Sequence, residues 1–242
     1  VPMKVLLLCY NRPLADAISL GLQDEPGIQT LSFHQLCDRR IRQVLQRTGK
    51  DLLEEAKAAY PGSSDKHLFE VQMPYALALS NEVLDEKYDA IVVDEAQDFS
   101  DEYWFAVEEL LVDQQVGHLF IFIDENQALY PRHGNLPVAD EPYYLTSNCR
   151  NTAPIHDAGY AFYAGEPIDA PDLPGPAVER IAVDGDDAQA DAIVRRVHRW
   201  VVDEAIRPED IAVLIAKRPK GLAYELLQGK GRAAGISWAI EV

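Results

Sequence analysis

The sequence predicts an α/β protein built on a doubly wound parallel sheet. Three short apolar runs, Val5–Cys9, Tyr88–Val93 and His118–Ile123, have the pattern of strands that are buried on both faces. Stretches with helical periodicity separate these runs, and strands that alternate with helices are typical of parallel sheets. The second and third runs are followed directly by the acids Asp94 and Asp124. Because ligands bind outside the carboxyl ends of such strands, we expect a site there.

The first half of the chain continues this pattern. Asn11-Arg12-Pro13 turns the chain after the first strand, and Pro61-Gly62-Ser63-Ser64 is a loop signal. Ser100 is placed to cap a helix. The expected elements, in chain order, are a helix over 14–22, a strand over 27–31, a helix over 33–46, a helix over 68–84 and a helix over 101–112, with a polar stretch over 47–66.

The second half predicts another α/β unit, so we expect two domains, 1–145 and 146–242. Thr152-Ala153-Pro154 opens a helix, and residues 165–177 are rich in proline and glycine, which indicates a loop. The expected elements that follow are a strand over 177–183, a helix over 188–202, a strand over 211–215, a helix over 222–228 and a strand over 236–240.

Composition excludes several classes of protein. The chain has 242 residues, 48% of them hydrophobic, which is enough for one large or two smaller folded domains. No apolar run approaches the roughly 20 residues that cross a bilayer, and we expect a cytoplasmic protein without a membrane partner. The three cysteines are far apart, which favours reduced thiols over a zinc site. The net charge of -18 argues against coating nucleic acid by bulk electrostatics.

The acidic string Asp94-Glu95-Ala96-Gln97-Asp98 follows a buried strand. Mg²⁺ prefers oxygen ligands and keeps several waters, so one carboxylate is suited to hold a metal–phosphate complex. The adjacent carboxylate is suited to polarise a water for attack on a phosphoryl group. A bare Asp-Glu pair is also common in solvated helix caps, and the full string is much more specific than the pair.

Asp94-Glu95-Ala96-Gln97-Asp98-Phe99 resembles motif II of the UvrD/Rep group of superfamily 1 helicases. Residues 119–130 resemble their motif III, with Ile123 in place of the usual glycine, and residues 145–152 resemble motif IV, with Cys149 in place of a tyrosine. Residues 5–15 and 31–34 are similar to motifs Ia and Ib, and 206–214 to a phrase of the second domain. The order and spacing of these motifs match the family.

The resemblance implies a RecA-like fold of the P-loop NTPase type, an incomplete second RecA-like domain, and the cofactors ATP and Mg²⁺. It implies that Asp94 binds Mg²⁺ and that Glu95 is the general base. Gln97 and Gln127 would sense the γ-phosphate, supported by Asp124, and Arg150 would reach the γ-phosphate as an arginine finger, which its planar fork suits.

The resemblance also implies contacts with single-stranded DNA, including stacking of Tyr130 on a base, which tolerates any sequence. Each of these residues has a structural alternative: Phe33 as core, His34 as a cap and Tyr130 as a packing residue. The residues that the resemblance places on DNA are Asn11, Arg12, Ser32, Phe33, His34 and Tyr130.

The phosphate-binding loop G-x-x-x-x-G-K-S/T does not occur in the 242 residues. Its glycines let backbone N–H groups surround the phosphates, and its lysine meets their charge. In the family this loop precedes motif Ia, and motifs V and VI would follow residue 242. We therefore interpret the chain as the central part of a motor, and expect it to hydrolyse ATP little or not at all by itself.

Three functions stay open at this point. The first is part of an ATP-dependent DNA helicase or translocase that moves on single-stranded DNA. The second is a non-catalytic RecA-like module that binds a protein partner or regulates, which the missing loop and the charge favour. The third is the motor part of a helicase–nuclease fusion, which only flanking sequence would identify.

Overall fold

The computed structural model describes residues 3–113, 117–124, 136–165, 167–216 and 221–239. The chain divides into two compact units, Val1–Leu173 and Pro174–Val242. The segment 146–173, expected to open the second domain, groups by its contacts with the first unit. Each unit is described by itself.

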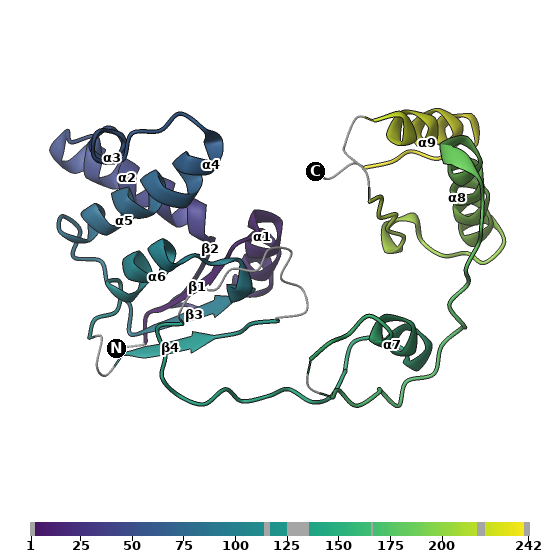
Figure 1. The fold of residues 1–242 in the computed structure, drawn as a ribbon, viewed down its shortest axis with the longest axis horizontal. Coiled ribbons are helices and arrows are strands. Elements are labelled where there is room, and N and C mark those ends of the chain that lie inside the picture. Colours follow the sequence, from purple (N-terminus) through teal and green to yellow (C-terminus); the bar gives the residue numbers. More distant parts are fainter. Residues whose placement is uncertain (1–2, 114–116, 125–135, 166, 217–220, 240–242) are drawn as a thin grey trace. The chain divides into compact units, whose positions relative to one another are not determined.

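The first unit contains a four-stranded parallel sheet in the order β2-β1-β3-β4. The predicted strands at these four places are confirmed, and the α/β class with them. Their bounds are β1 Val5–Cys9, β2 Ile28–Ser32, β3 Ala90–Asp94 and β4 His118–Ile121. The chain runs from β1 outward to β2 and then crosses back to β3 on the other side of β1, so the direction of winding reverses between β1 and β3 (Figure 1).

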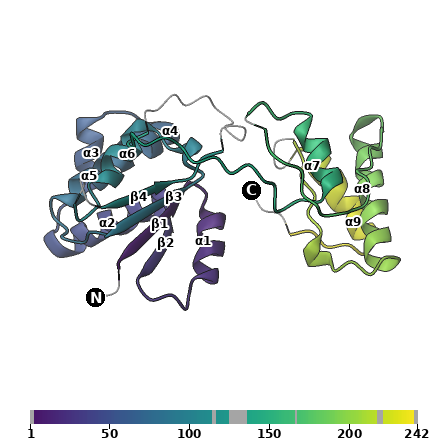
Figure 2. The ribbon, with the colours of Figure 1, turned by 90° about the horizontal axis from the view of Figure 1, so that it is seen from below.

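Helices cover the sheet on both faces (Figure 2). One face carries α1 (Arg12–Gly21), which packs against β1 and β2. The other face carries α2, α3, α5 and α6, which enclose the main hydrophobic core. The helices of this second face are α2 Phe33–Thr48, α3 Leu52–Ala59, α4 Asp65–His67, the π-helical turn η1 Leu68–Gln72, α5 Met73–Asn81 and α6 Asp101–Glu108.

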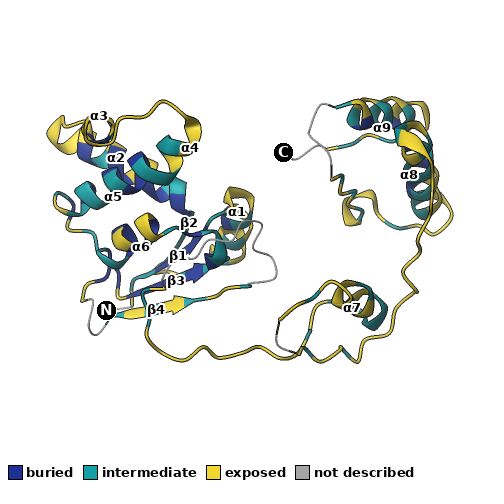
Figure 3. Ribbon diagram, viewed as in Figure 1, coloured by how far each residue is buried: buried dark blue, intermediate teal, exposed yellow. Residues whose placement is uncertain are grey.

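Alternation along the strands explains the two faces. Leu6 and Leu8 of β1 and Ile91 and Val93 of β3 are fully buried in the main core. β4 is an edge strand, and its Phe120 is 54% exposed, in contrast to the inner strands (Figure 3). The inner pair β1–β3 is therefore the rigid base from which the following loops emerge.

The polar stretch 47–66 contains a helix, α3, that was not predicted from the sequence. Asp51 caps this helix: its side chain accepts the backbone N–H groups of Leu53 and Glu54 at 3.0 and 3.2 Å. Leu52 and Ala56, four residues apart on one helix face, are buried in the core. Burial of these two apolar side chains against the core stabilises a helix within an otherwise polar stretch.

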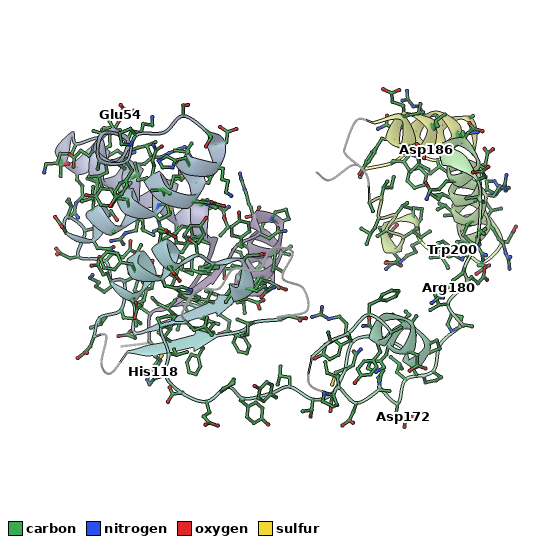
Figure 4. The ribbon with its side chains drawn as sticks, in the orientation of Figure 1. Glu54, His118, Asp172, Arg180, Asp186 and Trp200 are labelled. Carbon is green, nitrogen blue, oxygen red and sulfur yellow. The ribbon has the colours of Figure 1, made fainter. Side chains whose placement is uncertain are left out.

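The second unit is a pair of helices, α8 (Gly185–Val202) and α9 (Leu222–Ala233), packed on extended segments. Asp186 and Trp200 lie near the two ends of α8 (Figure 4). The strands predicted over 177–183, 211–215 and 236–240 are not formed among the residues described there: these segments are extended but lack ladder hydrogen bonds. Leu214 is 95% exposed, so one side of its segment has no cover.

None of the described helices is long and apolar enough to cross a membrane.

Candidate functional site

The carboxyl ends of β1 and β3 meet at the point where the winding of the sheet reverses. Cys9, the last residue of β1, lies beside Asp94, the last residue of β3, in the parallel register. In doubly wound sheets the crevice outside these two strand ends is the usual ligand site. His118, labelled in Figure 4, lies at the start of β4, so the far end of that strand is the one that approaches the acidic turn.

The turn after β3 has an unusual backbone. Glu95 adopts φ 54° and ψ 43°, the left-handed region that side chains rarely enter. Such a conformation costs about 1–2 kcal/mol relative to right-handed backbone. Its N–H donates to the Asp94 carboxylate at 3.0 Å, and the next N–H, of Ala96, donates to the Phe122 carbonyl at 3.0 Å. The strand thus ends abruptly, and two adjacent carboxylates are held at its tip, both half-buried.

Gln97 joins the ends of β3 and β4. It lies in the short 3-10 turn η2 (Ala96–Asp98). Its side-chain N–H donates to the Glu95 carboxylate, and its carbonyl oxygen accepts the backbone N–H of Asp124 at 3.1 Å. The structure therefore brings together four of the predicted site residues: Asp94, Glu95, Gln97 and Asp124.

Cys9 is the buried neighbour of this acidic turn. Burial, together with the nearby carboxylates of Asp94 and Glu95, raises the pKa of its thiol to about 11. The thiol is therefore protonated at neutral pH, and it donates to the Asn11 carbonyl at 3.2 Å. A thiol with so high a pKa is not a nucleophile.

The donor set suits a magnesium–phosphate complex more than an independent metal site. Among the described residues, no group of three or more His, Cys, Asp or Glu side chains converges as a metal site. Mg²⁺ is commonly held by one or two carboxylates, with water and substrate phosphate oxygens completing its shell. Asp94 offers such a carboxylate at the strand tip, so the residues present fit a metal that arrives with a phosphate ligand.

The predicted DNA contacts after β1 and β2 are divided between structural and exposed positions. The Asn11 side chain caps α1 by accepting the N–H of Leu14 at 3.3 Å. Ser32 is 2% exposed and forms a capping box with Gln35 at the start of α2. Arg12 is exposed, and its guanidinium lies 3.6 Å from an Asp16 carboxylate oxygen. Of these three predicted contacts, Asn11 and Arg12 are exposed and Ser32 is buried.

Phe33 is fully buried, so its ring cannot contact a bound strand directly. It stacks on Tyr103 with ring centroids 3.9 Å apart and meets Phe99 edge to face at 5.6 Å. The structural alternative for Phe33, a core residue, therefore describes this structure, and the prediction of a direct DNA contact is corrected. The ring fills the space between β2, α6 and the turn after β3.

His34 is half-buried and lies at the rim of this aromatic cluster. Its Nε2 is 3.2 Å from the Phe69 carbonyl and 3.3 Å from the Tyr103 hydroxyl. Burial lowers the pKa of His34, although the bond to the Phe69 carbonyl acts in the opposite direction. Its ring meets Tyr10 and Phe69 edge to face at 5.6 and 5.1 Å.

This cluster also contains Tyr10, Phe69 and Tyr103, which were not predicted from the sequence. Phe69 is 42% exposed and belongs to the π-helical turn η1, a helix type that is frequent at functional sites. Tyr10 directly follows β1, and that position was its signal in the sequence. The sequence contained no such signal for Phe69, because an aromatic residue in a helix is usually a core residue.

Arg150 lies in a loop that Asn148 shapes. The Asn148 side-chain oxygen accepts the N–H groups of Arg150 and Asn151 at 3.1 and 3.2 Å, and its amide nitrogen is 3.1 Å from Nδ1 of the buried His156. The loop precedes α7 (Ala153–Tyr160). Among the described residues, the hydrogen bond at Arg150 is a local one from its backbone N–H. The two remaining predicted residues, Gln127 and Tyr130, lie outside the described residues.

No protein-family model matches this chain, and no curated protein matches it significantly in sequence.

Proposed function

We propose that this chain supplies the metal- and water-binding part of an ATP-hydrolysis site in a DNA helicase or translocase of the UvrD/Rep type. In this proposal the parallel sheet is a RecA-like sheet, and the second unit belongs to a second RecA-like domain. The observation that carries the proposal is the pair Asp94 and Glu95 at the tip of β3, beside the point where the winding reverses. The ordered motifs of the sequence resemblance support it.

Asp94 would hold Mg²⁺ through one carboxylate oxygen, directly or through water. Bound there together with ATP, Mg²⁺ would supply positive charge that offsets the negative charge developing on the transferred phosphate. Glu95 would accept the proton of the attacking water, and its half-buried position directly after Asp94 at the end of β3 supports this. Arg150, Gln127 and the missing phosphate loop would complete the site, as the resemblance implies.

Single-stranded DNA would pass the carboxyl ends of β1 and β2. Tyr10, His34 and Phe69 are the partly exposed rings there, and Arg12 is the nearby exposed cation. Ring stacking is worth about 1–3 kcal/mol per base and needs no particular sequence. Binding through a few aromatic rings and cations is compatible with a net charge of -18, because such binding depends on local contacts and not on the net charge of the protein.

The test is Glu95→Gln in the natural full-length protein. We expect the DNA-stimulated ATPase kcat to fall at least about 100-fold while ATP affinity stays within about three-fold, since the amide keeps the shape but cannot take the proton. Glu102→Gln, an exposed acid of α6, is the matched control and should leave both values unchanged. Turnover retained in Glu95→Gln would remove Glu95 from the base role.

The second candidate is a non-catalytic RecA-like module that binds a protein partner. One observation favours it: the net charge is -18, which opposes binding to the phosphates of nucleic acid. In this case neither ATP nor oligonucleotide would bind the full-length protein in titrations, and Glu95→Gln would change no activity. A phosphate-binding loop encoded just upstream in the same reading frame would favour the enzyme instead.

A further inference from the structure

The Gln97 side chain is engaged at both ends of its amide. The amide nitrogen donates to Oε2 of Glu95, and the amide oxygen accepts the Asp124 backbone N–H at 3.1 Å. Glu95 follows β3, and Asp124 lies just beyond the end of β4. One side chain therefore ties the Glu95 carboxylate to the main chain of the neighbouring strand end.

The backbone around Glu95 reaches the same strand end by a second route. The Ala96 N–H donates to the Phe122 carbonyl at 3.0 Å, and the Phe122 N–H donates to the Val93 carbonyl at 2.8 Å. The main chain on both sides of Glu95 is thus fixed to the residues that follow β4. What this backbone does not fix is the end of the Glu95 side chain, which has three rotatable bonds.

The hydrogen bond from Gln97 restrains that end. A half-buried carboxylate with an amide donor and a fixed main chain has far fewer accessible positions than an exposed glutamate. The rate of a proton transfer depends steeply on such placement: an error of about 1 Å can cost on the order of 100-fold. The Asp124 N–H has a matching role, because it holds the Gln97 amide in the orientation whose nitrogen faces Glu95.

We propose that Gln97 is the positioning residue for Glu95, and that it acts through the Glu95 carboxylate without touching the nucleotide. This inference rests on the proposed function. It differs from the γ-phosphate contact that the sequence resemblance implies for Gln97, because the amide oxygen and one amide N–H are already committed to Asp124 and Glu95. Gln97 then affects the chemical step and leaves recognition of the third phosphate unchanged.

The experiment compares two variants of the natural full-length protein. Gln97→Met keeps the approximate shape and removes both hydrogen bonds, whereas Gln97→Glu keeps the acceptor for the Asp124 N–H and removes the donor to Glu95. Gln46→Met, on the exposed side of α2, is the control for the substitution itself. Thermal melting of all variants verifies folding. Steady-state ATPase gives kcat and KM, and titrations with ADP and a slowly hydrolysed ATP analogue give the affinity ratio.

We expect both Gln97 variants to lower kcat by about 10- to 100-fold, with KM and the ATP-to-ADP affinity ratio within about two-fold of wild type. In a Glu95→Gln background, Gln97→Met should cause no further loss, because a residue that acts through Glu95 has nothing left to position. Gln46→Met should behave as wild type.

Two results overturn the inference while the wild type remains active. An unchanged kcat in either folded Gln97 variant removes the positioning role. A lost preference for the ATP analogue over ADP assigns Gln97 to the γ-phosphate instead. A full-length wild type without ATPase activity is a different outcome: it overturns the proposed function itself, and the Gln97 role with it.

Discussion

Phe33 gives the sharpest test of whether the aromatic cluster is a core or a ligand surface. Its ring is fully buried and stacked at 3.9 Å on Tyr103. Replacement of such a phenylalanine by alanine costs about 3–5 kcal/mol. At about 2–4 °C per kcal/mol for a unit of this size, the expected drop in melting temperature is about 6–20 °C. Phe33→Leu, which keeps an apolar side chain, should cost about 1–2 kcal/mol, mostly the lost ring stacking and a small cavity.

The assay measures stability and oligonucleotide binding on the same samples. Urea unfolding followed by fluorescence gives the free energy of unfolding, and anisotropy of a labelled deoxythymidine oligonucleotide gives affinity. We expect Phe33→Leu to lose stability but to keep affinity within about two-fold, because its ring faces the core. His34→Ala should weaken binding by about five-fold or more if its ring stacks on a base. The reasoning is refuted if Phe33→Leu is as stable as wild type and binds as weakly as His34→Ala.

Three further predictions concern stability. Asp51→Ala should lower the free energy of unfolding by about 1 kcal/mol in urea titrations, because it removes the cap of α3, and Asp51→Asn should restore most of the loss. Ser80→Ala should cost about 1–3 kcal/mol, because the buried Arg40 Nε donates to the Ser80 hydroxyl at 2.9 Å and would lose its acceptor, while the exposed Ser19→Ala serves as control and should cost nothing measurable. Burial lowers the pKa of His34. Below the ordinary pKa of 6.5, the unfolded chain therefore binds a proton at His34 that the folded chain does not bind. The free energy of unfolding should fall as the pH drops from 7.5 to 5. His34→Asn should show a smaller fall over that range, and an equal fall would remove His34 as its source.

The sheet was predictable from the sequence because its strands are apolar runs with clear ends. Val5–Cys9 and the run before Asp94 are buried on at least one face, which is what a continuous apolar run indicates. The acids at the strand ends then marked the edge of the sheet where a site was to be expected. The strand order was not predictable, because parallel pairing is decided by which helices cover which face.

The second unit shows the limit of the same reasoning. Ile211–Ile215 has the composition of a buried strand, yet it is extended without a ladder in this structure. A β-strand forms only when it hydrogen-bonds to a neighbouring strand, and an apolar run does not show which segment that neighbour is. Helix α8 needed no such partner, because its hydrogen bonds are internal, and it formed near the predicted place.

Phe33 and Phe69 show why the rim of the site was predictable only in part. Both are aromatic residues next to or within helices, and the sequence alone does not distinguish a buried ring from an exposed one. Phe33 points into the core, whereas the π-helical turn leaves Phe69 42% exposed. A π-helical turn contains one more residue per hydrogen-bonded turn than an α-helix, and amino-acid composition does not predict where such a turn occurs.

Under the proposed function, Glu95 combines a strained backbone with a catalytic side chain. A residue with positive φ is usually glycine or asparagine, and a glutamate there costs about 1–2 kcal/mol that a glycine would avoid. Contacts from Asp94, Gln97 and Phe122 hold the turn in place despite this cost. Such strain persists where the surrounding structure over-determines it, and it gathers at active sites. A glycine at this position would ease the backbone but remove the carboxylate, so under the proposed function the glutamate at position 95 is kept for its side chain and not for the stability of the turn.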